Sequence, residues 1–501
     1  MNNNIKITKK LIRKFYFLGC VFLYIFLFLS LCFSLSLLTG CASVIEAYPD
    51  RVQPAKDKLN QADYSSAIKK IQALQSDNNT QLIGLELGRT YQLAGQYAQS
   101  QQQYDQVLTQ VRVDQEKAKI EVSRLLSQSG ALLINPQAVS YRLMPYEVVY
   151  LLGYQALNEL GENDPSNALV YLRQAYEEQQ YIESEQAKEM LLADQKSQKE
   201  GWKFNPADHA KEFNATMTAA SHIKNGFENA WVYYLTALVN FSQGNNNDAF
   251  VAIKQALSVA PENPTVRNLL LDILVQRGGD LTQLNQYLKN FGLTQAPSIP
   301  EKSGLVVFMY EQGWVPEMQT VRVPIPLVIG VNQPQIQWIS FPVYQAPEAT
   351  MTPLSIQIGS QLNSSSNQTA VLLNVYDLAA KNLKDRYPLI FVQAVLSALA
   401  KAAVTASLSS SNNQNADALF SLAGSLYGAV MSNADCRSWL TLPRDEQIWQ
   451  EFVPAGNYPV QLSNFGKTQT VSIKVLGNQV TLIWVVQSED SSDFKARVFN
   501  F

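Results

Sequence analysis

Apolar residues recur at three- and four-residue spacing from Pro54 to about Gly292, and runs of β-branched residues are few. This spacing places the apolar side chains on one face of a helix. It predicts a helical domain over residues 54–295. A polar and charged stretch inside it, from Tyr181 to Lys199, predicts a solvated helix.

A degenerate repeat runs through this helical region. Its fullest copy consists of Leu87-Gly88, Tyr91, Gly95, Tyr97, Ser100, Tyr104 and Val107, at the spacing of a tetratricopeptide repeat. Shorter copies surround Ala168, Leu172 and Ala175, and again Ala249, Ile253 and Ala256. Small residues at such positions let two antiparallel helices approach closely. The pattern predicts a solenoid that presents a groove to a partner, and a helical domain without a groove function is the alternative.

From residue 296 the periodicity changes to alternation of apolar and polar residues, which predicts strands. Strands are expected at 304–310, 318–325, 336–344, 354–358, 370–376, 448–453 and 460–462. Residues 469–476 and 480–487 predict a hairpin that turns at Gly477-Asn478. Pro324, Pro326 and Pro342 have to lie at strand ends or on edge strands, because proline cannot donate a ladder hydrogen bond.

Between these strand regions, residues 377–432 predict a helical hairpin with a loop near residues 409–415. No charged residue occurs between Lys401 and Asp417. The segment could be membrane-active, but no apolar run reaches the roughly 18 residues that a span needs, so we favour packed core helices. The predicted fold class is α+β: the solenoid, an antiparallel β region over 296–376, the hairpin, and a sandwich-like C-terminal β region over 433–501. The two β regions can pack as one domain.

The beginning of the chain predicts export and a lipid anchor. Five basic residues are followed by an uncharged apolar run from Phe15 to Leu38, and Leu38-Thr39-Gly40-Cys41 resembles a bacterial lipobox. Residues 1–40 are then a signal peptide, Cys41 is the lipidated residue, and 41–53 form a linker. Several acyl chains on one cysteine make a stable anchor, at about 0.8 kcal/mol per buried methylene. An uncleaved membrane-spanning helix is the alternative, because the run is long enough to cross a bilayer.

Both interpretations leave the basic residues in the cytoplasm and export the rest. Because Ala42 and Ser43 follow Cys41 where an aspartate would favour retention, we expect the periplasmic face of the outer membrane, with an inner-membrane anchor as the alternative. Removing residues 1–40 takes away five positive charges and leaves 34 basic against 42 acidic residues, a net charge of −8. This charge argues against a nucleic-acid partner and against binding to an anionic membrane surface through charge. Cys436 is the remaining cysteine besides Cys41, and we interpret it as a packed thiol.

Few residues suggest chemistry. His209 and His222 lie 13 residues apart and form no metal-binding motif, and no phosphate-binding loop predicts a cofactor. Asp435, Arg437 and Trp439, with Asp445 and Glu446 close by, are the best ligand-binding candidate, since arginine can hold an anion beside an aromatic face. The structural alternative is an Asp–Arg pair at the helix-to-sheet junction with Trp439 in the core. Glu311 with Arg322 or Arg386 has the same two interpretations.

Four segments resemble a group of bacterial lipoproteins with tetratricopeptide-like repeats for which no activity is established. The segments are 230–264, Val306–Gly313, Leu383–Pro388 and Ala434–Pro443. The resemblance spans most of the chain after Cys41. It implies the fold and the compartment and leaves the function open.

We therefore expect a non-catalytic envelope protein that binds a partner protein through its repeats and the membrane through its lipid. The first alternative is a periplasmic module that binds a glycan, such as peptidoglycan, or a small ligand in the β-rich half. The second is a hydrolase with a carboxylate site, which needs no histidine.

Overall fold

The computed structural model describes residues 47–74, 77–127, 140–278, 281–328, 334–347, 349–359, 367–409, 433–488 and 493–501. The chain divides into two units, Met1–Arg51 and Val52–Phe501. Of the first unit, only residues 47–51 are described, so the predicted signal peptide and Cys41 lie outside the described residues. Apart from the beginning of the first helix, the described helices and strands belong to the second unit.

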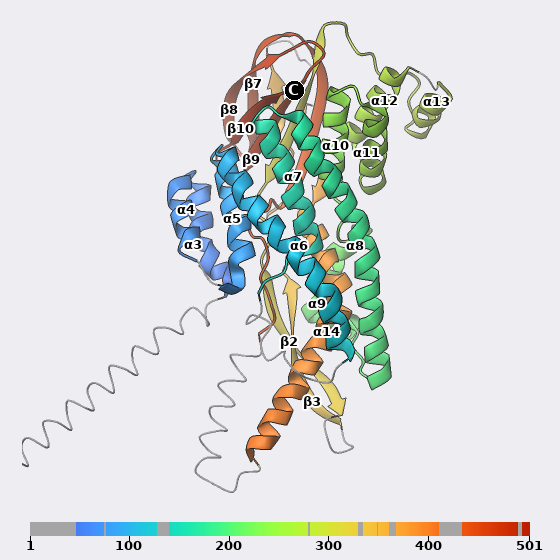
Figure 1. The fold of residues 1–501 in the computed structure, drawn as a ribbon. Helices are drawn as coiled ribbons and strands as arrows, with labels where there is room; N and C mark the ends of the chain where they lie inside the picture. The colour runs from blue at the N-terminus through green and yellow to red at the C-terminus, as the bar shows by residue number, and fades with distance from the viewer. Residues whose placement is uncertain are drawn as a thin grey trace, which may run out of the picture. The chain divides into compact units, whose positions relative to one another are not determined.

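The N-terminal half of the unit is helical, as the spacing predicts. Its helices are α3 (Tyr48–Asn60), α4 (Tyr64–Gln72), α5 (Thr80–Leu93), α6 (Tyr97–Ser127), α7 (Pro145–Gly161), α8 (Pro165–Glu200), α9 (Ala210–Ser221), α10 (Ala230–Ser242), α11 (Asn246–Val259), α12 (Pro264–Arg277) and α13 (Leu281–Asn290). Consecutive helices pack as the pairs α5–α6, α7–α8 and α10–α11 (Figure 1). The polar stretch from Tyr181 to Lys199 continues α8 as a largely exposed helix.

Glycines sit where these helices cross most closely. A methyl group added to Gly88 of α5 would meet the buried ring of Tyr104 on α6. One added to Gly153 of α7 would lie 2.6 Å from the Trp231 ring on α10 and 2.8 Å from Val232. Glycine is therefore required at these crossings by the approach of the neighbouring helix.

The C-terminal half is rich in strands, so the α+β class is confirmed. Its elements are β1 (Ser303–Gln312), β2 (Met318–Val328), β3 (Pro334–Tyr344), β4 (Ser355–Ile358), β5 (Ala370–Asn374), α14 (Val375–Ser409), β6 (Asp445–Pro454), β7 (Gly456–Asn464), β8 (Lys467–Val475), β9 (Val480–Gln487) and β10 (Lys495–Asn500). They form a five-stranded sheet in the order β10-β9-β1-β6-β5, a three-stranded sheet β4-β7-β8 and the pair β2-β3. The five-stranded sheet thus combines strands from both predicted β regions.

The predicted hairpin around Gly477-Asn478 is wrong. β8 pairs with β7, whereas β9 lies between β10 and β1 and runs parallel to β1. The chain therefore passes from one sheet to the other between the two strands. A two-residue turn of the expected type needs positive φ at both central residues, but of these two only Asn478 has one, at 60°.

The five-stranded sheet is the middle of three layers. Alternate residues of β1, namely Val306, Phe308 and Tyr310, pack with Ile483 of β9 and with the three-stranded sheet in a sandwich core. The intervening residues of β1 face the helices, where Glu311 meets α5. Burial on both faces explains why every residue of β1 and β9 is buried, although antiparallel sheets often keep one face in water.

The β2–β3 pair packs beside α9 and α14. Phe341 of β3 stacks on Phe204 with ring centroids 4.3 Å apart, and Phe213 of α9 and Tyr387 of α14 complete the aromatic cluster. The predicted loop after Ser409 and the second helix of the predicted hairpin fall within residues 410–432, outside the described residues. Among the described helices, none is both long and apolar enough to cross a membrane.

Candidate functional site

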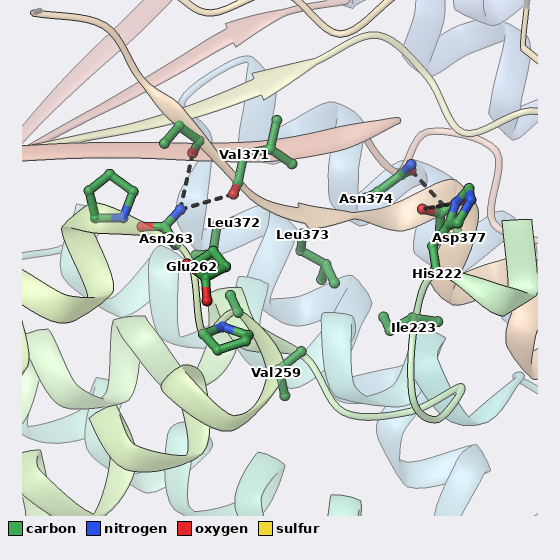
Figure 2. Close-up of a pocket in the computed structure, with 14 residues that line it drawn as sticks. His222, Ile223, Val259, Glu262, Asn263, Val371, Leu372, Leu373, Asn374 and Asp377 are labelled. Carbon is green, nitrogen blue, oxygen red and sulfur yellow. Dashed lines mark hydrogen bonds and ion pairs between the residues drawn. The ribbon is translucent and has the colours of Figure 1, made fainter. Parts of the chain in front are cut away.

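An open groove with a volume of about 340 Å³ lies between the last helices and the edge of the five-stranded sheet (Figure 2). Its walls are the α11–α12 turn (Val259–Pro264), the whole of strand β5 (Ala370–Asn374), His222, Ile223 and Asp377. β5 is the terminal strand of its sheet, with β6 on one side and the groove along its other side. An edge strand with a groove beside it is the kind of surface to which an extended peptide can add.

Asn263 joins the two walls of the groove. Its Oδ1 accepts hydrogen bonds from the backbone N–H groups of Thr265 and Val266, at 3.0 and 3.1 Å, and so caps the start of α12. Its Nδ2 donates to the carbonyl oxygen of Val371 at 2.9 Å (Figure 2). Pro264 follows at the first helical position, where its missing N–H costs no helix hydrogen bond. One side chain therefore both begins a helix and covers part of the β5 edge.

A contact between a histidine and an aspartate lies at the opposite end of the groove. His222 Nδ1 is 3.2 Å from Asp377 Oδ2, and the Asn374 Oδ1 accepts a hydrogen bond from the Asp377 N–H at 3.3 Å (Figure 2). Burial raises the pKa of Asp377, and the neighbouring His222 opposes that rise. The sequence gives no signal for this pair, because 155 residues separate its members.

The sequence-predicted candidates Asp435, Arg437 and Trp439 lie elsewhere, in a buried segment without regular structure that precedes β6. Arg437 holds Asp435 through two nitrogens, at 2.8 and 2.7 Å, and its third nitrogen bonds to Asn79 at 3.0 Å. Trp439 is fully buried, and its ring N–H donates to Thr441 at 3.0 Å. These contacts are those of the structural alternative, and the ligand-binding interpretation stays a prediction.

Three other residues considered from the sequence also have internal partners. Asp445 bonds to Arg444 at 3.1 Å. The buried thiol of Cys436 lies 3.4 Å from the Thr320 hydroxyl, and burial raises its pKa to about 11. His209 stacks on Phe204. Among the described residues, no group of three or more His, Cys, Asp or Glu side chains is placed to hold a metal ion.

Two buried glutamates fasten the segment around Trp439 to the helices. Glu147 of α7 accepts the Trp439 N–H at 2.7 Å, and Glu86 of α5 accepts the Leu440 N–H at 2.8 Å. Burial raises the pKa of each carboxyl to about 7, against hydrogen bonds that lower it. This face of α5 and α7 is therefore covered by the protein's own chain.

Two further contacts show that the protein's own chain also covers the inner face of α10 and α12. Tyr234 of α10 donates to Gln450 of β6 at 2.5 Å, and Gln450 donates to Asp272 of α12 at 3.0 Å. The helical face that meets the sheet is thus occupied along α5, α7, α10 and α12. The groove beside β5 lies at the end of this covered face.

An ion pair without solvent contact lies at the centre of the interface. Arg89 of α5 bonds to Glu311 of β1, and the Trp484 ring N–H donates to Glu311 at 2.9 Å. Arg89 is thus the partner of Glu311, in place of the two arginines that the sequence suggested. Glu446 of β6 is also fully buried beside them, and neither of its oxygens has a hydrogen-bond partner among the described residues.

Comparison with known proteins adds no relative: no protein-family model matches the chain, and no curated protein matches it.

Proposed function

We propose that the protein is a non-catalytic, lipid-anchored envelope protein that acts as a protein–protein interaction scaffold through its tetratricopeptide-like repeats. Its proposed place is the periplasmic face of the outer membrane, with Cys41 as the lipidated residue. The observation that supports partner binding is the groove between the α11–α12 turn and the edge of β5.

The groove is the proposed binding surface because the helical face that meets the sheet is already covered by the protein's own chain. A partner segment at the face of α5 and α7 would have to displace Trp439 and the backbone hydrogen bonds that Glu86 and Glu147 accept. At the groove, the described contact that an added segment would have to replace is the hydrogen bond from Asn263 to the Val371 carbonyl, and Val371 is 41% exposed. We therefore propose that an extended segment of the partner lies along β5, where backbone hydrogen bonds provide affinity and side-chain pockets provide specificity.

Site-specific photocrosslinking in intact cells tests the binding surface. A photoreactive amino acid is placed at Val371 of the full-length chain, and the matched control is Val170 on α8, which is 47% exposed. The proposal expects a crosslinked protein of defined mass from position 371 that is absent from position 170. It is contradicted if position 371 gives no adduct or if both positions give the same adducts.

The anchor has its own test. Mass spectrometry of the mature protein should find a chain that begins at Cys41 and carries a diacylglyceryl thioether and an amide-linked acyl chain. Cys41→Ser should leave the first 40 residues attached. An unmodified amino terminus in the membrane fraction would disprove lipidation without affecting the crosslinking result.

A further inference from the structure

The β2–β3 hairpin (residues 318–344) carries apolar side chains on its exposed face. Trp338 lies directly opposite Pro324, and Ile336 lies directly opposite Pro326. Directly opposed residues of antiparallel strands project from the same face. Trp338 is 65% exposed and Ile336 is 67% exposed, and both prolines are exposed as well. The other face is already buried, through Val323, Ile325, Leu327 and Ile339.

The hairpin is also nearly free of charge. From Met318 to Tyr344 the only charged residue is Arg322, in a chain in which 16% of residues are charged. Arg322 is exposed and bonds to Asn433 at 3.3 Å. The exposed apolar face is therefore accompanied by one positive charge and no negative charge, which complements a surface of anionic phosphates.

A second uncharged stretch begins in the helix that packs on the hairpin. Helix α14 (orange in Figure 1) contacts β3 and ends at Ser409. The sequence carries no charge between Lys401 and Asp417. The charged residues that would oppose contact with lipid are thus scarce in both stretches.

We propose that the β2–β3 hairpin docks on the surface of a lipid bilayer. Trp338 and Ile336 enter the boundary between headgroups and acyl chains, where tryptophan is favoured, and Arg322 lies at the phosphates. A further strand is a poor occupant, because prolines in both strands remove N–H groups that an added strand would need. This contact is independent of the acyl chains on Cys41 and of the groove beside β5.

Vesicle flotation tests the proposal on a chain that begins at Ala42, which lacks the lipidated residue and contains the whole Val52–Phe501 unit. The vesicles contain phosphatidylethanolamine with about one anionic phosphatidylglycerol in four lipids. The variant is Ile336→Gln with Trp338→Gln. The control is Leu281→Gln, because Leu281 on α13 is 75% exposed and lies outside the hairpin.

The proposal expects the parent chain and the Leu281→Gln control to float equally. The double variant should bind the vesicles at least about tenfold more weakly. Brominated lipids provide a measurement that needs no variant. They should quench the parent fluorescence, because Trp231, Trp439, Trp449 and Trp484 are buried and Trp338 is the tryptophan most open to solvent. Absent flotation of the parent chain, equal flotation of all three proteins, or fluorescence without quenching overturns the proposal. A protein crosslinked at Trp338 in cells, without flotation, assigns the face to a protein partner instead.

Discussion

Glu311 and Glu446 lie directly opposite each other on β1 and β6, on the sheet face that meets the helices. Glu311 has the guanidinium of Arg89 and the ring N–H of Trp484, whereas Glu446 has no hydrogen-bond partner among the described residues. Two adjacent buried carboxylates cannot both ionise at low cost. Burial, and then the charge of Glu311, raise the pKa of Glu446 well above its usual value. Glu446 is therefore the protonated member of the pair.

The stability of the unit should decrease as pH rises. Burial raises the pKa values of Glu86, Glu147 and Asp272 to about 7, from 4.5 for the glutamates and 3.8 for the aspartate. A carboxyl that stays protonated in the folded state while the unfolded chain ionises loses stability between its two pKa values. The loss is about 1.4 kcal/mol per pH unit for each group. Urea unfolding between about pH 4 and pH 7 should show this slope.

Glu446→Gln is the matched variant for this slope. Glutamine cannot ionise, so the variant should lose less stability than the parent as pH rises through and beyond the same range. The unfolding free energy of the variant minus that of the parent should therefore become more positive as pH rises. Parallel pH profiles for the two proteins would mean that Glu446 does not titrate differently on unfolding.

Arg89→Met should be among the most destabilising single changes in the unit. It leaves Glu311 buried without its cation, and removing one member of a buried pair costs about 3–5 kcal/mol. Adding Glu311→Gln should recover part of the loss, so the two changes should not be additive. Lys188→Met, at the exposed pair with Glu185, is the control and should have little effect. Chemical denaturation of five proteins, the parent, Arg89→Met, Glu311→Gln, the double variant and Lys188→Met, measures these differences. A small loss for Arg89→Met alone contradicts the prediction.

The fold class could be predicted from the sequence because the helical and strand periods are strong. A continuous apolar run placed β1 close to its observed bounds, and alternation did the same for β2 and β3. The small residue of the fullest repeat copy placed the crossing at Gly88. Strand pairing could not be predicted in the same way. Every residue of β9 is buried, a pattern typical of a central strand covered on both faces, and this burial favours the five-stranded sheet over a hairpin with β8.

The sequence indicates only one side of the buried Arg89–Glu311 ion pair. Glu86 and Arg89 are charged residues within the largely apolar sequence of α5, which marks them as buried groups in need of partners. The partner of Arg89 lies 222 residues away, on a strand whose position depends on the whole sheet. The groove beside β5 left no sequence signal, because turns and edge strands acquire their surroundings only in the folded chain.

Gly88→Ala should destabilise the α5–α6 pair. The added methyl group would enter the space of the Tyr104 ring, which is fully buried and cannot move freely, and such overpacking costs about 1–3 kcal/mol. Gly477→Ala is the control, because its methyl group would find its nearest neighbour at 3.7 Å and its φ is not positive. Thermal unfolding should show a lower midpoint for the first variant alone. A large loss for Gly477→Ala would instead support the hairpin turn that the sequence predicted.

Substitutions at Asn263 should separate its two hydrogen-bonding roles. Serine can still cap α12 through its hydroxyl, but it is too short to donate to the Val371 carbonyl, whereas alanine loses both roles. We expect Asn263→Ala to be less stable than Asn263→Ser by about 1 kcal/mol, the usual contribution of an N-cap side chain. Because Asn263→Ser uncovers part of the β5 edge, it should also retain or increase the crosslinking yield from position 371. Equal stabilities would show that the cap contributes little, and a loss of crosslinking in the serine variant would show that Asn263 itself contacts the partner.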